Sequence, residues 1–440
     1  MRLLHISDTH LGRKVAGNLA RDAEFDGVID EIVAIAQDQR PDLIVHSGDF
    51  FDTWQMSPTE LKRALQMTRR LAAVAPMVAI AGNHDSPGVF RLLDEVFDDG
   101  AGGGPRRRVR FVDRPMPAQA GGILTFPARD GMQTVRVAAL PFVHPNRAYR
   151  EFRDSDAASR SYADLLARVF ADLGRGLDAG RDPRSELRVL VAHQYIEGAV
   201  VSATERRIGT EDAQQSGVLP RVEYAAIGHI HKPQAIARTD VKARYAGSPL
   251  QLDFGEEGQE KSVVVVEANP GRPTRIEPIV LRAGRTMKTI TGTFPQIAAS
   301  ADRVGNAYVK AVVEIEDDDQ LYLVERVAKA LPRATVVNAV ARNAAARTAV
   351  VDHVALLEES RDITEDFREF LAQENFGGAR AEALVETLTA TLALVGEERA
   401  GTGGSAEERL LLAAVDAAGC CTTPDASTKS GDSSEEGDAQ

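Results

Sequence analysis

Five short segments of the chain carry side chains that bind metal ions, in a fixed order. The segments are Asp8-Thr9-His10, Gly48-Asp49, Gly82-Asn83-His84-Asp85, His193 and Gly228-His229-Ile230-His231. Carboxylates, imidazoles and an amide oxygen without a thiolate suit manganese, iron or zinc better than magnesium, which prefers all-oxygen surroundings. Two such ions about 3.5–4 Å apart can clamp the attacking and leaving oxygens of a phosphodiester. These residue types therefore predict hydrolysis at a two-metal site.

Short apolar runs are the elements that must position these side chains. Runs of this length, bounded by glycine and polar residues, are typical of buried strands. The five runs, each with the candidate that follows or ends it, are 3–7 before Asp8, 42–48 before Asp49, 78–82 before Asn83, 188–192 before His193 and 224–228 before His229. Five strand ends are thus expected to bring polar ligands to one edge.

The segments between the first three runs have helical periodicity. Residues 24–36 and 61–72 repeat apolar side chains at helical spacing. Strand, helix and strand in alternation favour an α/β sheet with helical crossovers. In open sheets of this class, ligands collect at the carboxyl ends of the strands.

Each candidate residue also has a purely structural interpretation. A single histidine at the end of an apolar strand is more often hydrogen-bonded within the core than bound to a metal, and aspartate after glycine often forms a turn. His5 and His46 lie inside the predicted strands, so we assign both to packing. The joint occurrence of five segments is what favours a metal site.

The segments resemble the signature of the calcineurin-like metallophosphoesterase family, which runs D-x-H, G-D, G-N-H-[DE], H and G-H-x-H. The residues that flank these motifs are most similar to those of the bacterial nuclease subunits that are related to the archaeal and eukaryotic break-repair nuclease. This similarity covers roughly residues 1–395 and is strongest in four stretches, which are residues 5–12, 48–53, 81–86 and 245–251.

The resemblance implies an α/β fold, a four-layer sandwich of mixed sheets flanked by helices, with a small α+β capping domain and C-terminal helices. The expected parts are a nuclease domain at 1–280, a capping domain at 285–358, partner-binding helices at 361–396 and a disordered tail at 401–440. The chain itself suggests a boundary where Pro270 to Pro278 and Gly284 follow the last strand of the catalytic sheet.

The resemblance also implies roles for the site residues. Two divalent ions, with manganese the expected metal, would share Asp49 as a bridge. His84 would act on the substrate phosphate, with Asp52 orienting its ring. The remaining expected ligands are Asp8, His10 and His231 for one metal and Asn83, His193 and His229 for the other.

Composition limits the kinds of partner that the chain can bind. The formal net charge of −13 over 440 residues disfavours a broad nucleic-acid surface, so DNA contacts must come from local basic patches. Arg106, Arg107 and Arg108 form one candidate patch. No apolar stretch approaches the roughly 18 residues of a membrane span, so we expect a cytoplasmic protein without membrane contact. Its adjacent cysteines, Cys420 and Cys421, indicate no disulfide framework.

The C-terminal part contains apolar faces for which the resemblance suggests a partner. In the related nucleases this region binds the coiled-coil base of an ATPase. The expected contact residues are Ile363, Phe367, Phe370, Leu371, Leu384 and Leu388. From residue 401 onward, small and acidic residues dominate, and we expect disorder.

The resemblance therefore predicts a DNA nuclease with 3′-5′ double-strand exonuclease and single-strand or hairpin endonuclease activity. It would act in DNA repair, recombination and replication, as a homodimer within a heterotetramer that includes the ATPase. A phosphodiesterase acting on a small nucleotide is the alternative on the same fold. A protein phosphatase is disfavoured because Phe50-Phe51-Asp52-Thr53 replaces the arginine-containing phosphatase motif.

Overall fold

The computed structural model describes residues 1–15, 20–98, 108–143, 162–202, 216–315, 323–331 and 334–341. The chain divides into one unit from Met1 to Arg342 and a second from Asn343 to Gln440, and all described residues belong to the first. The expected partner-binding helices, the tail and the end of the expected capping domain lie outside the described residues. Within the described residues, no helix has both the length and the apolarity needed to cross a lipid bilayer.

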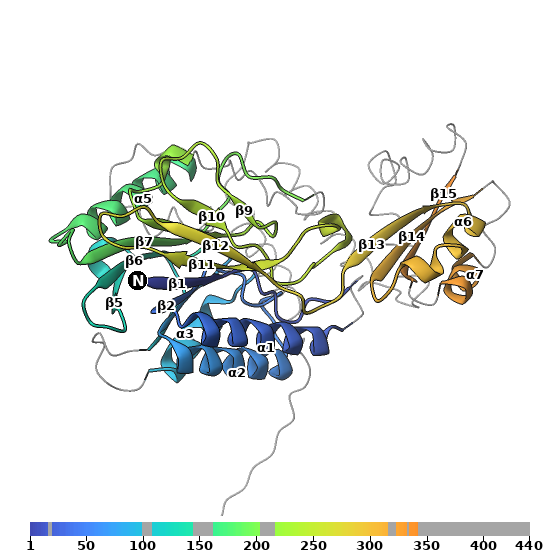
Figure 1. The fold of residues 1–440 in the computed structure, drawn as a ribbon, viewed down its shortest axis with the longest axis horizontal. Helices are drawn as coiled ribbons and strands as arrows, with labels where there is room; N and C mark the ends of the chain where they lie inside the picture. The colour runs from blue at the N-terminus through green and yellow to red at the C-terminus, as the bar shows by residue number, and fades with distance from the viewer. Residues whose placement is uncertain are drawn as a thin grey trace, which may run out of the picture. The chain divides into compact units, whose positions relative to one another are not determined.

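The first sheet has six strands in the order β12-β11-β1-β2-β3-β4 (Figure 1). Strands β1 to β4 run parallel, whereas β11 is antiparallel to both of its neighbours. The strands are β1 (Arg2–Ile6), β2 (Leu43–His46), β3 (Met77–Ile80), β4 (Val109–Val112), β11 (Ser262–Glu267) and β12 (Arg275–Val280). The three predicted N-terminal strands are confirmed as neighbours in one parallel sheet.

Three helices cover the outer face of this sheet: α1 (Asp22–Gln39), α2 (Pro58–Val74) and α3 (Pro87–Val96). The first two confirm the helices that periodicity predicts. Helix α2 starts with a capping box, in which the Ser57 side chain accepts from the Glu60 N–H while the Glu60 carboxylate accepts from the Ser57 N–H. The apolar faces of the helices pack on Leu4, Ile44 and Met77 of the sheet.

The second sheet has six strands in the order β5-β6-β7-β8-β10-β9 and carries helix α5 (Tyr162–Asp178). Side chains of both sheets, including Leu3, Val45, Val137 and Val189, form one buried cluster between them. The strands are β5 (Ile123–Pro127), β6 (Thr134–Leu140), β7 (Glu186–His193), β8 (Tyr224–Gly228), β9 (Gln234–Ala235) and β10 (Ala243–Tyr245). Helices, two mixed sheets and a helix form the expected four-layer sandwich.

The edge of the first sheet differs from the sequence interpretation. The stretch from Pro270 to Pro278 includes the first four residues of β12, which pairs with β11 along its whole length, and β11 therefore does not close the sheet. Pro278 lies opposite Val264. An edge strand tolerates proline because one row of its N–H groups faces away from the ladder. The prolines of this stretch therefore mark an edge strand and not a domain boundary.

A third sheet follows, with parallel strands in the order β13-β14-β15. Its strands are β13 (Met287–Gly292), β14 (Tyr308–Ile315) and β15 (Ala334–Ala341), with helices α6 (Phe294–Ala298) and α7 (Leu323–Ala330). Val309, Ala311 and Val313 of the central strand form a core with Val327 of α7. This small sheet joins the preceding segment where the Met287 N–H donates to Gln251 Oε1 at 2.6 Å.

Candidate metal centre

The predicted ligands come together at the carboxyl ends of strands from both large sheets. Strands β1, β2 and β3 lead to Asp8, Asp49 and Asn83, while β7 ends at His193 and β8 leads to His229. The hydrogen bond from the Asp8 N–H to the Gly48 carbonyl, 3.0 Å, ties the first two loops together. The sandwich thus brings candidate ligands from both large sheets together at one edge.

The backbone of these loops is strained at the candidate ligands. Asp8, His10, Asp49 and His229 all have positive φ, at 49°, 42°, 52° and 104°. Only six non-glycine residues in the described part of the chain adopt positive φ. Such a conformation costs about 1–3 kcal/mol per residue and persists only where the surrounding structure enforces it. Its concentration here independently marks this edge as a functional site.

We call Asp8, His10 and His231 the first half of the cluster. One ligand atom from each, together with one from Asp49, lies within 4.8 Å of all the others. Asp8 Oδ1 accepts from the His229 N–H at 3.0 Å. Asp8 Oδ2 is buried without a hydrogen-bond partner among the described residues. An unpaired buried carboxylate oxygen is costly, so a cation at this point would stabilise the protein.

Asn83, His193 and His229 form the second half of the cluster. His193 Nε2 and His229 Nδ1 each lie 3.0 Å from Asn83 Oδ1. The other nitrogen of His193, Nδ1, donates to the Ser47 carbonyl at 2.8 Å. In the neutral ring, Nε2 therefore carries a lone pair that points at an amide oxygen, an arrangement that a cation makes favourable.

Asp49 is the residue that both halves share. Its Oδ2 lies 3.4 Å from His10 Nε2 and 3.4 Å from His193 Nε2. Its Oδ1 accepts from the His84 N–H at 2.9 Å, which fixes the carboxylate. This position between the halves is the one a bridging carboxylate requires. The donor set of the cluster fits two divalent metal ions.

The electrostatics of the cluster also call for positive charge. Burial alone would lower the pKa of His10, but Asp49 and Asp52 outweigh burial and raise it to about 10. Burial likewise opposes a charged His193, yet Asp49 raises its pKa to about 9. Protons on these rings therefore compensate the buried carboxylates in the metal-free protein. Metal ions bound at the same atoms would take over that role.

The contacts of His84 and Asp52 differ from those expected. His84 Nδ1 donates to the main-chain carbonyl of Asp52 at 2.7 Å, not to its carboxylate. The carboxylate instead lies 3.3 Å from His10 Nδ1 and 3.3 Å from Arg13, whose positive charges attract it. Burial lowers the pKa of His84, so its ring is neutral at neutral pH in the metal-free protein. The ring of His84 lies 4.8 Å from that of His10, beside the cluster.

Two buried carboxylates support the site, and neither was assigned a role from the sequence. Asp85 accepts from the N–H groups of Phe50, Phe51 and Gly82 at 2.8–3.1 Å, which fixes two ligand loops on each other. Glu256, in a 3-10 turn from Phe254 to Glu256, accepts from His231 Nδ1 at 2.8 Å. The D in G-N-H-D signals Asp85, whereas no sequence signal separates Glu256 from its neighbour Glu257.

The histidines assigned to packing lie in the core. His5 is fully buried, with Nδ1 2.9 Å from the Tyr224 hydroxyl and Nε2 2.8 Å from Ser47 Oγ. His46 Nε2 lies 3.1 Å from Thr9 Oγ1. Burial lowers the pKa of both rings to about 3. Both therefore remain neutral and structural.

Of the candidate DNA patch, only Arg108 is described, and Arg106 and Arg107 lie outside the described residues. The Arg108 guanidinium donates to the Ala72 carbonyl in the last turn of α2, at 2.6 and 3.0 Å, and Arg108 directly precedes β4, at the amino-terminal edge of the parallel strands. The six expected partner-contact residues, Ile363 to Leu388, also lie outside the described residues.

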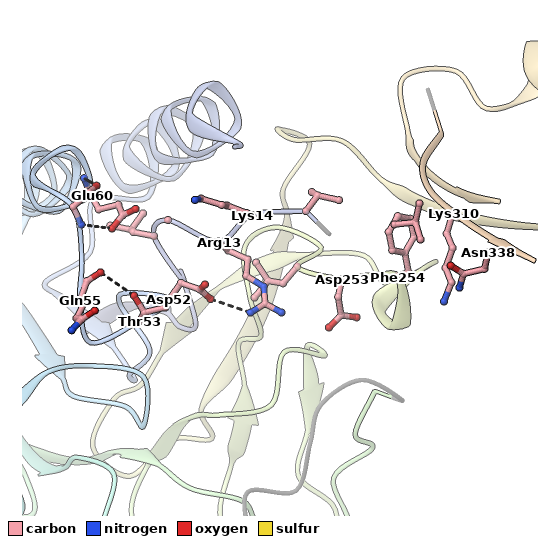
Figure 2. Close-up of a pocket in the computed structure, with 16 residues that line it drawn as sticks. Arg13, Lys14, Asp52, Thr53, Gln55, Glu60, Asp253, Phe254, Lys310 and Asn338 are labelled. Carbon is pink, nitrogen blue, oxygen red and sulfur yellow. Dashed lines mark hydrogen bonds and ion pairs between the residues drawn. The ribbon is translucent and has the colours of Figure 1, made fainter. Parts of the chain in front are cut away.

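A cavity of about 700 Å³ adjoins the cluster at Asp52. One wall includes Leu11 to Val15 with Thr53, Gln55, Ser57 and Glu60, and the other includes Lys310 and Asn338 of the small sheet. Figure 2 shows Arg13 turned towards Asp52, with Lys14 close by and Lys310 on the opposite side. The cavity thus lies beside the candidate metal centre, where Asp52 contacts His10, and carries cationic side chains on two walls.

The family model for calcineurin-like phosphoesterases matches residues 1–233. The chain therefore belongs to the calcineurin-like phosphoesterase family. Family membership, together with the histidine and aspartate cluster, defines a metal-dependent phosphoester hydrolase.

Two relatives resemble the chain over nearly its whole length. Both are named as the D subunit of nuclease SbcCD, one from Bacillus subtilis (strain 168) at 27% identity over 420 residues and one from Escherichia coli (strain K12) at 28% over 417 residues. Each match covers 91% of this chain and 100% of the relative. Two solved structures, TT1561 of Thermus thermophilus and a dimetal phosphatase from Danio rerio, match 64% of this chain and 99% of their own, at 12% and 11% identity. Their TM-scores are 0.34 and 0.35.

Proposed function

We propose that this protein is the nuclease subunit of an SbcCD-type complex, a metal-dependent DNA nuclease. The observation that carries the proposal is the convergence of seven candidate ligand residues, with Asp49 between the two halves, at the carboxyl edge of two sheets. The match to the D subunit of nuclease SbcCD over the full length of that relative supports the choice of DNA as substrate. We assign 3′-5′ double-strand exonuclease and single-strand or hairpin endonuclease activities to this site.

We assign the ligands according to the two halves of the cluster. Asp8, His10 and His231 would hold one metal, Asn83, His193 and His229 the other, and Asp49 both. Bound here, two divalent ions would supply an activated water and a clamp on both oxygens of the phosphodiester. We propose manganese because its preferences match mixed oxygen and imidazole donors.

His84 is the proposed catalytic residue. The Asp52 carbonyl holds the Nδ1–H, which leaves Nε2 as the nitrogen available to the substrate phosphate. To stabilise developing charge or to protonate the leaving 3′ oxygen, the neutral ring would first have to take up a proton at Nε2 and would then act as an imidazolium. Asp52 contributes in two ways, through its carbonyl to His84 and through its carboxylate to His10.

The cavity supplies cations beside the cluster in a chain whose net charge is acidic. Arg13, Lys14 and Lys310 line it, and it reaches the cluster at Asp52. We propose that the DNA strand next to the scissile phosphate lies here, between the 1–280 nuclease domain and the 285–358 capping domain. Phosphate contacts by lysine and arginine dominate such binding and make it sensitive to salt.

The proposed partner is an SbcC-type ATPase, bound through the helices at 361–396, in a heterotetramer with two copies of this chain. We place the complex in the cytoplasm and in DNA repair, recombination and replication. The alternative is a phosphodiesterase for a small nucleotide. Such an enzyme has no need of the small sheet, and the described chain carries that sheet against the loop after β10.

The test is nucleotide release from end-labelled linear duplex DNA in manganese, with His84→Ala and, as a surface control, Arg175→Ala alongside. We expect release by the wild type and by Arg175→Ala, and about a hundred-fold slower release by His84→Ala, since a general acid contributes roughly that factor. Hydrolysis of a small nucleotide diester without any attack on DNA, even with the ATPase added, would favour the alternative. Unchanged release by His84→Ala would remove the proposed catalytic residue.

A further inference from the structure

The segment from Tyr245 to Lys261 contains a cluster of buried polar side chains that the assigned ligands do not explain. Ser248 and Glu256 are 0% exposed, and Gln251 and Lys261 are each 6% exposed. Burying carboxylate and ammonium groups is costly unless they are paired. The buried charges of Glu256 and Lys261 therefore need specific partners that stabilise them.

Glu256 is the centre of this cluster. Its Oε2 lies 2.6 Å from Lys261 Nζ and accepts from the Leu252 N–H at 3.1 Å. Its Oε1 accepts from His231 Nδ1 at 2.8 Å. The carboxylate thus spans from a buried cation on one side to a proposed metal ligand on the other.

The contact with Glu256 fixes the tautomer of His231. An ionised carboxylate only accepts hydrogen bonds, so the proton of the neutral ring resides on Nδ1. The lone pair is then on Nε2, the nitrogen left to face Asp8 and His10. A carboxylate behind a ligating imidazole also makes the imidazole a stronger ligand.

Lys261 holds the main chain of the same ligand. Its ammonium donates to the His231 carbonyl at 2.9 Å and to Ser248 Oγ at 2.9 Å. The Ser248 N–H also donates to the His231 carbonyl, at 3.1 Å. Ring and backbone of His231 are therefore fixed by one ion pair, contributed by a segment that follows His231 in the chain.

We infer that Glu256 is a positioning residue for His231, with Lys261 as its counter-ion, and that metal binding in the first half of the cluster depends on this pair. The inference rests on the proposed two-metal site. The second half has no equivalent requirement, because a neutral main-chain carbonyl, that of Ser47, orients His193.

The test is calorimetric titration of the metal-free full-length protein with Mn²⁺, for the wild type, Glu256→Gln and Glu257→Gln. Glu257 is the matched control, since its carboxylate accepts from the Thr289 N–H of the small sheet. We expect two sites in the wild type and in Glu257→Gln. In Glu256→Gln we expect one site to weaken about 10–100-fold and the other to remain unchanged, as for other residues that support a metal ligand. If Glu256→Gln bound Mn²⁺ at both sites with wild-type affinity, the inference would be overturned.

A second variant guards against misfolding. Glu256→Gln leaves the Lys261 ammonium buried without its carboxylate, so the double variant Glu256→Gln/Lys261→Met removes both charges. It should unfold cooperatively and bind one Mn²⁺ as weakly as the single variant. Wild-type affinity at both sites in the double variant would also overturn the inference. Failure of the wild type to bind two Mn²⁺ ions would instead contradict the proposed function.

Discussion

The two halves of the cluster are held in place by partners of different kinds. In the first half, a buried ion pair between Glu256 and Lys261 fixes His231. In the second half, the Ser47 carbonyl fixes His193, and Gly48 leaves the space for its ring. One half thus depends on charge and the other on backbone geometry and space. Substitutions of charge and of volume should therefore separate them.

The largest effect should come from Asp49, the residue common to both halves. Asp49→Asn removes the charge that lies 3.4 Å from a histidine in each half. We expect hydrolysis of bis-p-nitrophenyl phosphate in manganese to fall at least about a thousand-fold, or about 4 kcal/mol of transition-state stabilisation. Asp113→Asn, which changes a surface partner of Arg91, is the control. A loss of less than about ten-fold would show that neither half needs Asp49.

Volume added at Gly48 should break the second half. A Cβ at this position would lie 2.2 Å from His193 Nδ1, and its φ is +104°. We expect Gly48→Ala to lower the free energy of unfolding by about 3 kcal/mol and to abolish one of the two Mn²⁺ sites. Urea unfolding and calorimetry measure these quantities.

Gly121→Ala provides a matched control for that substitution. Gly121 has φ of +110°, but a Cβ there would meet nothing within 4 Å. Its substitution should cost about 1 kcal/mol from backbone strain alone and leave both metal sites intact. Equal effects of the two variants would mean that space for His193 is unimportant.

The halves should behave alike in the protons that they release. Raised pKa values keep His10 and His193 protonated at neutral pH, one in each half. Metal binding must displace both, so about two protons should leave, and apparent affinity should rise with pH until about pH 9 to 10. Titration with Mn²⁺ in two buffers of different ionisation enthalpy measures this release. Identical heats in both buffers would contradict it.

The smallest effect concerns the contact between the small sheet and α1. Glu24 accepts from Tyr308, from Arg21 at 2.8 Å and from the Arg285 N–H at 2.9 Å. Burial raises the pKa of Glu24, but these partners outweigh burial and lower it overall. Its stabilisation is therefore complete above the ordinary carboxylate pKa and disappears as the pH falls through the lowered one.

Glu24→Gln should accordingly lower the free energy of unfolding by about 1 kcal/mol at neutral pH without changing either Mn²⁺ affinity. The difference from the wild type should shrink in urea unfolding on acidification through the pKa of Glu24. If the difference in the free energy of unfolding grew on acidification, the predicted direction of the Glu24 pKa shift would be wrong.

Residue patterns predict the parallel strands and first two helices of the first sheet and the edge at which the candidate ligands meet, whereas the four-layer sandwich follows only from the family resemblance. Apolar runs that end at Asp8, Asp49 and Asn83 identify strands, and parallel strands place their carboxyl ends at one edge. The edge strand β12 was missed because Pro278 usually argues against a strand. Local sequence rules cannot tell that this proline faces away from a ladder.

The supporting residues were harder to predict for a similar reason. Glu256 and Glu257 are adjacent and identical in type, yet one is buried against His231 and the other meets Thr289. The contact from Asp52 to His84 uses a main-chain carbonyl, which every residue has. Only the tertiary fold decides such pairings.

The most direct measurement is phosphodiester hydrolysis as a function of metal equivalents. Metal-free protein would be titrated with Mn²⁺ at a concentration well above its dissociation constants, and the rate with bis-p-nitrophenyl phosphate recorded at each step. A two-metal site predicts a rate that rises faster than linearly through the first equivalent and levels off at two. A rate that rises linearly and levels off at one equivalent would contradict the account.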